Sequence, residues 1–113
     1  MSNKDDPLNL TLTEESILNA ILFRERYGLE IMKAIAQASK GKKTIGFSSL
    51  YPNLRKLEQK GFVTSRWGDE APEENTGARR RYYQITGSGM AAVNLKQEYL
   101  TALQGLILNT GEL

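Results

Sequence analysis

The sequence contains no cysteine and no histidine. The absence of cysteine excludes a disulfide framework and thiolate chemistry. The absence of histidine removes the commonest general base and the commonest metal ligand. No apolar run approaches the roughly 20 residues of a membrane span, and the first residues, MSNKDDPLN, lack a signal-peptide core. We therefore expect a soluble cytoplasmic protein that holds no metal and no cofactor.

The remaining candidates for catalysis are weak. Ser48 and Ser49 have no histidine to activate them. The four carboxylates of the segment 68–78 lack the spacing of a calcium loop. The run Gly87-Ser88-Gly89 lacks the Gly-Lys-Ser/Thr ending of a phosphate-binding loop. The sequence is therefore not expected to encode an enzyme.

Charge is unevenly distributed along the 113 residues, whose net charge is only +2. Positions 40–81 hold ten basic and five acidic residues, whereas the two flanks hold five basic and eight acidic ones. A basic centre between acidic ends is typical of a surface that binds an anionic partner. The alternative is chance clustering of charge on a solvated face.

Apolar residues at helical spacing predict three short helices, and alternating residues predict two strands. The helices are expected from Thr11, which has a capping-box spacing to Glu14, to about 25–27, from about Leu29 to Gly41, and from Ser48 to Gly61. The strands are expected at 62–67 and 79–85, joined by a polar loop over 68–78, with a last helix from Thr86 to about Leu108.

The third helix has two different faces. At about 100° per residue, Leu50, Leu54 and Leu57 form one buried stripe. Ser48, Pro52, Arg55 and Gln59 point the opposite way. Ser48 is a plausible N-cap, which would place Pro52 in or just beyond the first turn, where its missing N–H costs little. If the helix begins earlier, Pro52 instead lies inside it as a kink.

The element order predicts a mainly α fold with a small β-hairpin (α+β): a winged helix-turn-helix with an added C-terminal helix. We expect a flexible lead-in over 1–10, a winged-helix domain over 11–86 and a dimerisation helix over 87–113. Trp67 and at least one tyrosine are expected to close the core at the sheet. Tyr83 is the expected inward residue and Tyr82 the more exposed one, or the reverse.

Binding to double-stranded DNA fits this fold. Small hydroxyls at Ser48 and Ser49 allow close approach to bases or phosphates, and Arg55 and Lys56 supply positive charge. Further cations are contributed by Lys42, Lys43, Arg79, Arg80 and Arg81. The arginine triplet suits contact with the DNA backbone, but it is equally explained as a charged edge strand that discourages aggregation. A protein-interaction adaptor and an RNA-binding module remain as rivals, although the aromatic platform of single-strand readers is missing.

The last helix is a candidate for dimerisation. Leu95, Tyr99, Ala102 and Leu106 follow a 4-3-4 spacing, and Leu103 widens the apolar belt. The belt is broader than the core of one domain requires, which indicates a two-fold partner helix. The alternative is a helix folded back onto the first helix of the same chain.

Several stretches together resemble the PadR-like winged-helix transcriptional regulators. They are YGLEI (27–31), LYPNLRKLE (50–58), GFV (61–63), GARRRYYQIT (77–86) and Gly89. The resemblance implies a homodimer on a palindromic operator, usually repressing transcription. The DNA-facing residues that it implies are Ser48, Ser49, Tyr51, Lys56 and Arg79 to Arg81.

The resemblance also implies that the dimer forms through the first and last helices, which contribute Ile17, Ile21, Leu95, Tyr99, Ala102, Leu103 and Leu106. Two departures matter. The family often has Gly-Arg-Pro-Arg at the wing, where this chain has Gly77-Ala78-Arg79-Arg80. The C-terminal part is a single helix, shorter than in members with a long ligand-sensing region, which argues against a small-molecule inducer.

Overall fold

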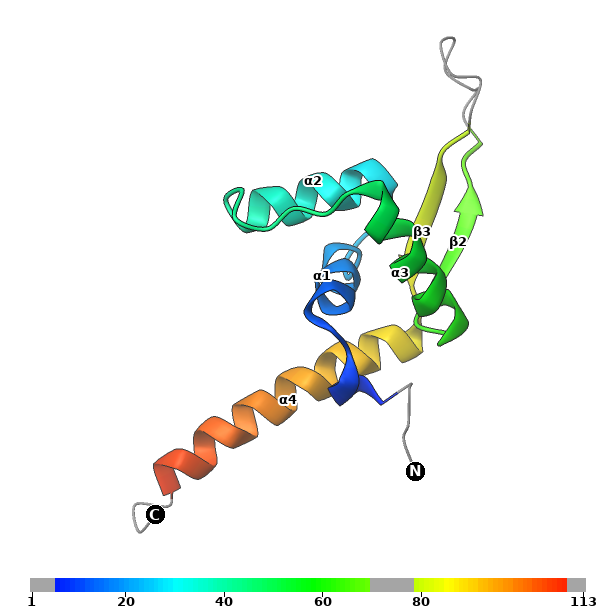
Figure 1. The fold of residues 1–113 in the computed structure, drawn as a ribbon. Coiled ribbons are helices and arrows are strands. Elements are labelled where there is room, and N and C mark those ends of the chain that lie inside the picture. Colours follow the sequence, from blue (N-terminus) through cyan, green and yellow to red (C-terminus); the bar gives the residue numbers. More distant parts are fainter. Residues whose placement is uncertain (1–5, 70–78, 110–113) are drawn as a thin grey trace.

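The computed structural model describes residues 6–69 and 79–109. It confirms the winged-helix α+β fold, with a small three-stranded antiparallel sheet beside the helices (Figure 1). The elements in chain order are η1 (Pro7–Asn9), α1 (Leu12–Ala20), β1 (Arg26–Tyr27), α2 (Gly28–Ala38), α3 (Phe47–Gln59), β2 (Val63–Trp67), β3 (Arg81–Ile85) and α4 (Gly87–Asn109). Within these described ranges, no helix has the length and apolar character needed to cross a membrane.

Helix α1 begins with the predicted capping box. The Thr11 hydroxyl accepts a hydrogen bond from the Glu14 amide at 3.1 Å, and a Glu14 carboxylate oxygen accepts one from the Thr11 amide at 2.9 Å. The helix ends at Ala20, earlier than predicted. The Arg26 side chain donates to the Ala20 carbonyl at 2.7 Å, so a residue of the following strand satisfies the helix end.

The sheet has the order β1-β3-β2. The predicted hairpin is present, with Val63 opposite Ile85 and Trp67 opposite Arg81. Strand β1 was not predicted, because a strand of two residues is too short to show an alternating pattern. It adds a third strand to the hairpin. From residue 70 onward, the predicted polar loop lies outside the described residues.

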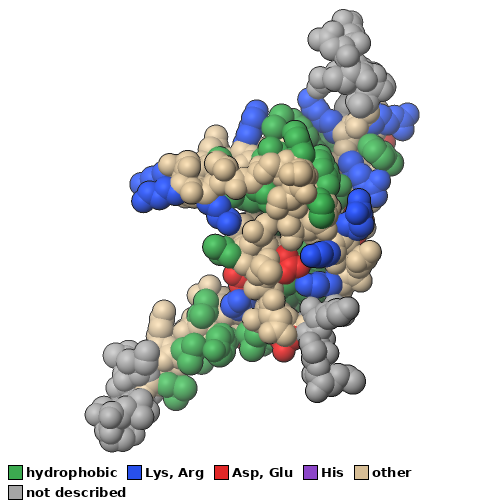
Figure 2. Space-filling model, viewed as in Figure 1, with side chains coloured by type: hydrophobic (Ala, Val, Ile, Leu, Met, Phe, Trp, Pro, Cys, Tyr) green, Lys and Arg blue, Asp and Glu red, His purple; other side chains and the backbone are tan. Residues whose placement is uncertain are grey.

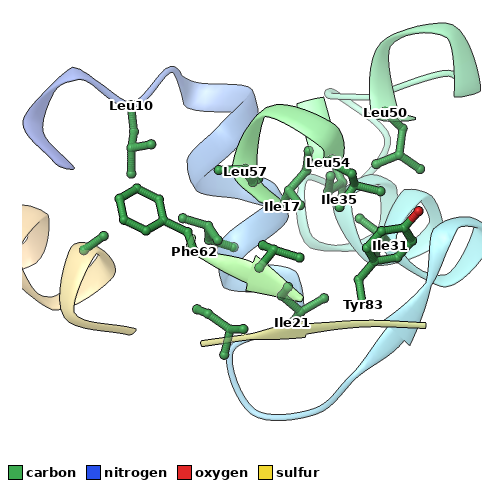
Figure 3. Close-up of a cluster of buried hydrophobic side chains, with 14 residues drawn as sticks. Leu10, Ile17, Ile21, Ile31, Ile35, Leu50, Leu54, Leu57, Phe62 and Tyr83 are labelled. Carbon is green, nitrogen blue, oxygen red and sulfur yellow. The ribbon is translucent and has the colours of Figure 1, made fainter. Parts of the chain in front are cut away.

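The core lies between the helices and one face of the sheet, where side chains from all four α-helices and from β2 and β3 come together (Figure 3). Tyr83 is 4% exposed and is the inward tyrosine. The prediction that Trp67 closes the core is wrong, because its side chain is 55% exposed. Trp67 shares a sheet face with buried Val63, but it lies at the last position of β2 and remains largely uncovered there.

The N-terminal segment corrects another expectation. Residues 6–10 of the predicted flexible lead-in are folded: Asp6 caps the 3-10 turn η1, accepting from the Leu8 amide at 3.0 Å. Leu10 is 7% exposed and belongs to the core. The buried side chain of Leu10 anchors this segment to the core. The composition of the first ten residues does not show that one of them is buried.

Helix α4 is capped by Thr86 as predicted, with the Gly89 amide donating to the Thr86 hydroxyl at 3.0 Å. Gly89 lies against the residue that precedes β2, where a Cβ would overlap the carbonyl oxygen of Phe62. From Gln97 to Gln104 every side chain is exposed, because α4 runs beyond the body of the molecule (Figure 1). The resulting shape is elongated, 66 × 33 × 23 Å.

Candidate nucleic-acid interface

Helix α3 presents the two faces predicted for it. Leu50, Leu54 and Leu57 are 0%, 1% and 0% exposed, and they attach the helix to the core. The opposite face is exposed over its whole length, and it consists of Ser48, Ser49, Pro52, Arg55, Lys56 and Gln59. The helix therefore offers hydroxyls near its start and cations one to two turns later.

The start of α3 lies two residues earlier than predicted. Gly46, and not Ser48, is the N-cap, and the helix begins at Phe47. Pro52 consequently lies inside the helix, where it has no N–H to donate to the carbonyl of Ser48. The alternative placement of Pro52 inside the helix is the one observed. Because Ser48 does not serve as the cap, its hydroxyl stays on the outer face.

Tyr51 has a packing role at this surface. Its ring stacks on Phe47, with centroids 5.7 Å apart and planes at 13°. Its hydroxyl lies against the start of α2, where a Cβ on Gly28 would overlap the hydroxyl oxygen. A side chain at position 28 would therefore displace the Tyr51 ring from its present place.

Phe47 is a surface residue that the sequence analysis missed. It is the first residue of α3 and is 51% exposed, although it is a large apolar side chain. Its stack on Tyr51 fixes the ring at the end of the helix that also carries Ser48 and Ser49. If the N-cap is placed at Gly46, Phe47 becomes the first residue of the helix and therefore part of the same surface.

The three arginines just before and at the start of β3 differ in their exposure and in their contacts. Arg79 is exposed, whereas Arg80 and Arg81 are half-buried. The Arg81 guanidinium donates to the Ser65 hydroxyl at 2.8 and 3.1 Å and stacks over Trp67, 5.1 Å from the ring centroid. The Arg80 guanidinium lies over the ring of Tyr27 at 4.6 Å.

Basic side chains gather along the side of the molecule that carries α3 and the base of the wing (Figure 2). Lys42 and Lys43 do not join that group. The Lys43 amide donates to the Ser39 hydroxyl at 2.9 Å, which keeps this turn at the C-terminal end of α2. The N-terminal end of α2, at Gly28, is the end that contacts Tyr51. The length of α2, about 16 Å at 1.5 Å per residue, separates the two places.

The predicted dimer residues fall into two groups. Leu95, Tyr99, Ala102, Leu103 and Leu106 are exposed on α4. Ile17 of α1 and Ile21, the C-cap of that helix, are 0% and 1% exposed, because both side chains belong to the core of their own chain. They have no surface to offer to a second chain, so their assignment to the interface is wrong.

Among residues 6–69 and 79–109, no group of three or more acidic side chains is arranged to hold a metal ion. What the described surface offers is positive charge, hydroxyls and an exposed aromatic ring on one helix and one hairpin. This arrangement suits an extended anionic partner.

Comparison with known proteins identifies the family to which the chain belongs. Residues 17–95, from α1 to the first half of α4, match the model of the "Transcriptional regulator PadR-like family". The chain belongs to this family. The match includes every residue of α3 and of the described base of the wing.

Individual relatives agree with the assignment. The chain is similar to a transcriptional regulator from Clostridium thermocellum, at 27% identity and a TM-score of 0.68, covering 88% of this chain and 89% of that one. A PadR-like transcription factor from Bacteroides fragilis shares the fold at a TM-score of 0.71 and 20% identity, covering 87% and 88%. "Uncharacterized protein X" of Lysinibacillus sphaericus is 35% identical over 75 residues, which span 66% of this chain and 65% of that protein.

Proposed function

We propose that this member of the PadR-like family is a sequence-specific DNA-binding repressor that acts as a homodimer on a palindromic operator. The observation that carries the proposal is the outer face of α3, where Ser48, Ser49, Arg55 and Lys56 are exposed above three buried leucines. Winged-helix and helix-turn-helix proteins place such a helix in the major groove.

The roles of the side chains follow from their chemistry. Ser48 and Ser49 lie at the N-terminal end of α3, where short hydroxyls permit close approach to base edges and phosphates. Arg55 and Lys56 lie farther along the helix, where arginine can bridge guanine O6 and N7 or bind a phosphate. Tyr51 joins this surface through its exposed edge. Lys42 and Lys43, at the far end of α2, are proposed to contact the DNA backbone farther along the duplex.

The wing supplies the second contact. Arg79, Arg80 and Arg81 precede or begin β3, at the base of the hairpin that projects from the body (Figure 1). Contacts from this base to the phosphate backbone would add to affinity for every sequence. The wing would then fix the register of α3 in the groove.

Dimerisation is proposed through α4. Its apolar belt, which includes Leu95, Tyr99 and Leu106, is exposed to solvent in one chain. A groove of about 520 Å³ between α1, α2 and α4 continues this belt, since Val93 and Leu100 line it. A second copy of α4 is the occupant that would cover both, because it carries the same apolar belt.

The repressor role comes from the resemblance to the family. Within the family, the compact size and the acidic wing sequence resemble Pex, the cyanobacterial circadian period-extender, which represses a clock gene. We propose the same kind of target for this chain as the narrower form of the assignment.

Selection of bound sequences from random duplex DNA, using the full-length protein, tests the proposal. The expected result is an inverted repeat with half-sites about one helical turn, roughly 34 Å, apart. Weak retention of all duplexes without any enriched sequence would contradict the proposal and favour a protein-interaction adaptor. Stronger retention of structured RNA than of any duplex would favour the RNA-binding alternative.

A matched pair of variants locates the contact. Lys56→Ala is expected to weaken binding to every duplex and to lower the salt slope, d log K/d log[salt], by about 0.9, the value for one phosphate. Gln59→Ala alters the same face of α3 without removing a charge, and its slope should equal that of the wild type. Equal slopes for both variants would remove Lys56 from the interface.

A further inference from the structure

The base of the wing carries a ladder of four side chains, in which two arginines flank a pair of tyrosine rings. The Arg66 guanidinium lies 4.9 Å from the centroid of Tyr82, and Tyr82 meets Tyr27 edge to face at 5.7 Å and 81°. The Arg80 guanidinium lies 4.6 Å from the centroid of Tyr27. The ladder therefore connects all three strands of the sheet.

Strand register explains this arrangement. Tyr82 of β3 is paired with Arg66 of β2 on one side and with Tyr27 of β1 on the other. Side chains of such pairs stand about 4.5–5.5 Å apart on the same face of a sheet. Tyr83 points into the core, so this ladder occupies the opposite face.

Two of the three arginines are thus held by the protein itself. Arg80 is stacked on Tyr27, and Arg81 is bonded to Ser65 and stacked on Trp67. The Gly68 amide donates to the Arg80 carbonyl at 2.7 Å, so the backbone is paired up to this residue. Arg79 precedes the paired segment and is the exposed member of the triplet.

We propose that Tyr27 is a positioning residue for the wing. Its ring holds Arg80 by a cation–π contact, and this contact fixes the direction in which the chain presents Arg79 to a phosphate. The inference rests on the proposed DNA-binding function and assigns different tasks within the triplet: Arg80 and Arg81 anchor the hairpin, and Arg79 contacts the DNA backbone. Tyr27 belongs to β1, which is the edge strand of the sheet opposite to β2.

The salt dependence of DNA affinity distinguishes a positioning role of Tyr27 from a purely structural one. The slope, d log K/d log[salt], counts the phosphates that the protein neutralises. Tyr27→Leu removes no charge. If the ring positions Arg79, this variant still loses the phosphate contact, and its slope falls by about 0.9, as for Arg79→Ala. We expect affinity to fall about five- to tenfold in each variant, within the range of one cation–π contact or one phosphate contact.

The experiment measures fluorescence anisotropy of the selected operator duplex with the full-length protein between about 50 and 200 mM salt. Tyr27→Phe keeps the ring and should match the wild type. The double variant Tyr27→Leu/Arg79→Ala should show no further loss of slope beyond either single variant. Phe23→Leu is the control, since it removes a 94% exposed ring from the connector that precedes β1.

Two results would overturn the inference while leaving the DNA-binding function intact. One is a wild-type slope for Tyr27→Leu together with a reduced slope for Arg79→Ala. The other is additive loss in the double variant. Failure of the wild-type protein to prefer any duplex would instead overturn the proposed function and this inference with it. Thermal unfolding verifies that each variant is folded, and Tyr27→Met replaces the leucine variant if that one is not.

Discussion

The ammonium group of Lys60 lies 2.8 Å from a carboxylate oxygen of Glu14, with the two side chains 16% and 5% exposed. The other oxygen of Glu14 accepts the Thr11 amide at 2.9 Å. Glu14 belongs to the first turn of α1 and Lys60 is the C-cap of α3. This pair therefore ties the end of the proposed DNA-reading helix to the start of the first helix.

The pair predicts that the free energy of unfolding of the protein changes with pH in the acidic range. Burial alone would raise the pKa of the Glu14 carboxyl, but hydrogen bonds from Lys60 and from the Thr11 amide, with the charge of Lys60, hold that pKa below its usual value of 4.5. A lowered folded-state pKa contributes stability above the unfolded value, and this contribution is lost as the pH falls through the folded value. Glu14→Gln should reduce the free energy of unfolding by about 1–3 kcal/mol at pH 7.

Urea unfolding at pH 7 and below pH 4 measures this effect. The difference between wild type and Glu14→Gln should shrink at the lower pH, because the wild-type carboxyl then takes up a proton. Glu15→Gln is the control: Glu15 pairs with Lys96 at 2.7 Å in a more exposed position, so its loss should cost under about 1 kcal/mol. A pH-independent difference for Glu14→Gln would contradict the assigned pKa.

Tyr83 predicts a loss of stability at alkaline pH. Its burial raises the pKa of the phenol above the usual 10.0. A raised folded-state pKa contributes stability that is complete below the unfolded value and is lost as the pH rises through the folded value. Wild type should therefore lose more free energy of unfolding between pH 9 and about pH 11 than Tyr83→Phe, which cannot ionise. Parallel curves for the two proteins would show that Tyr83 ionises as readily in the fold as in the unfolded chain.

We predict that the Phe47 ring contacts the methyl group of a thymine. An exposed aromatic ring at the first position of α3, the proposed DNA-reading helix, is suited to apolar contact with that methyl. In a selected operator, replacing each thymine in turn by uracil removes only the methyl. At one position per half-site, the replacement should weaken wild-type binding severalfold and leave Phe47→Ala unaffected. Equal sensitivity of both proteins at every position would place Phe47 away from the bases.

The apolar belt of α4 predicts a dimer that one charge can disrupt. Tyr99 lies within the belt and is 44% exposed in the single chain. Tyr99→Asp should convert the protein to a monomer in analytical ultracentrifugation, because burying an unpaired carboxylate at an interface is strongly unfavourable. Thr101→Asp adds the same charge on the opposite side of the helix, about 200° around its axis from Tyr99, and should leave the mass unchanged. Monomeric wild-type protein would refute dimerisation through α4.

Local periodicity predicted most elements because each depends on residues that are close in sequence. The capping box of α1, the leucine stripe of α3 and the Thr86 cap of α4 each lie within three to seven residues. The PadR-like family was recognisable for the same reason, since its motifs are short runs of consecutive residues. The boundary of α3 was misplaced because Gly46 and Ser48 are both acceptable N-caps.

The candidate surface was only partly predictable. The sequence identified the cations and hydroxyls of α3, which follow from the position of its leucines. It did not reveal that Tyr51 packs on Gly28, or that Phe47 is exposed beside it. The first depends on the approach of α2 to α3, which involves residues about twenty positions apart, and the second depends on where α3 begins.

By itself, the sequence determined the order of the four α-helices and of the two hairpin strands, the two faces of α3 and the position of the basic hairpin. Hydrophobic spacing and capping residues act over a few positions, so they can be read directly from the chain. Only the tertiary structure decided that Ile17 and Ile21 belong to the core, that Trp67 lies uncovered and that Arg80 rests on Tyr27. A side chain's burial and partners depend on which distant segments pack against it, and one-dimensional patterns contain no such distances.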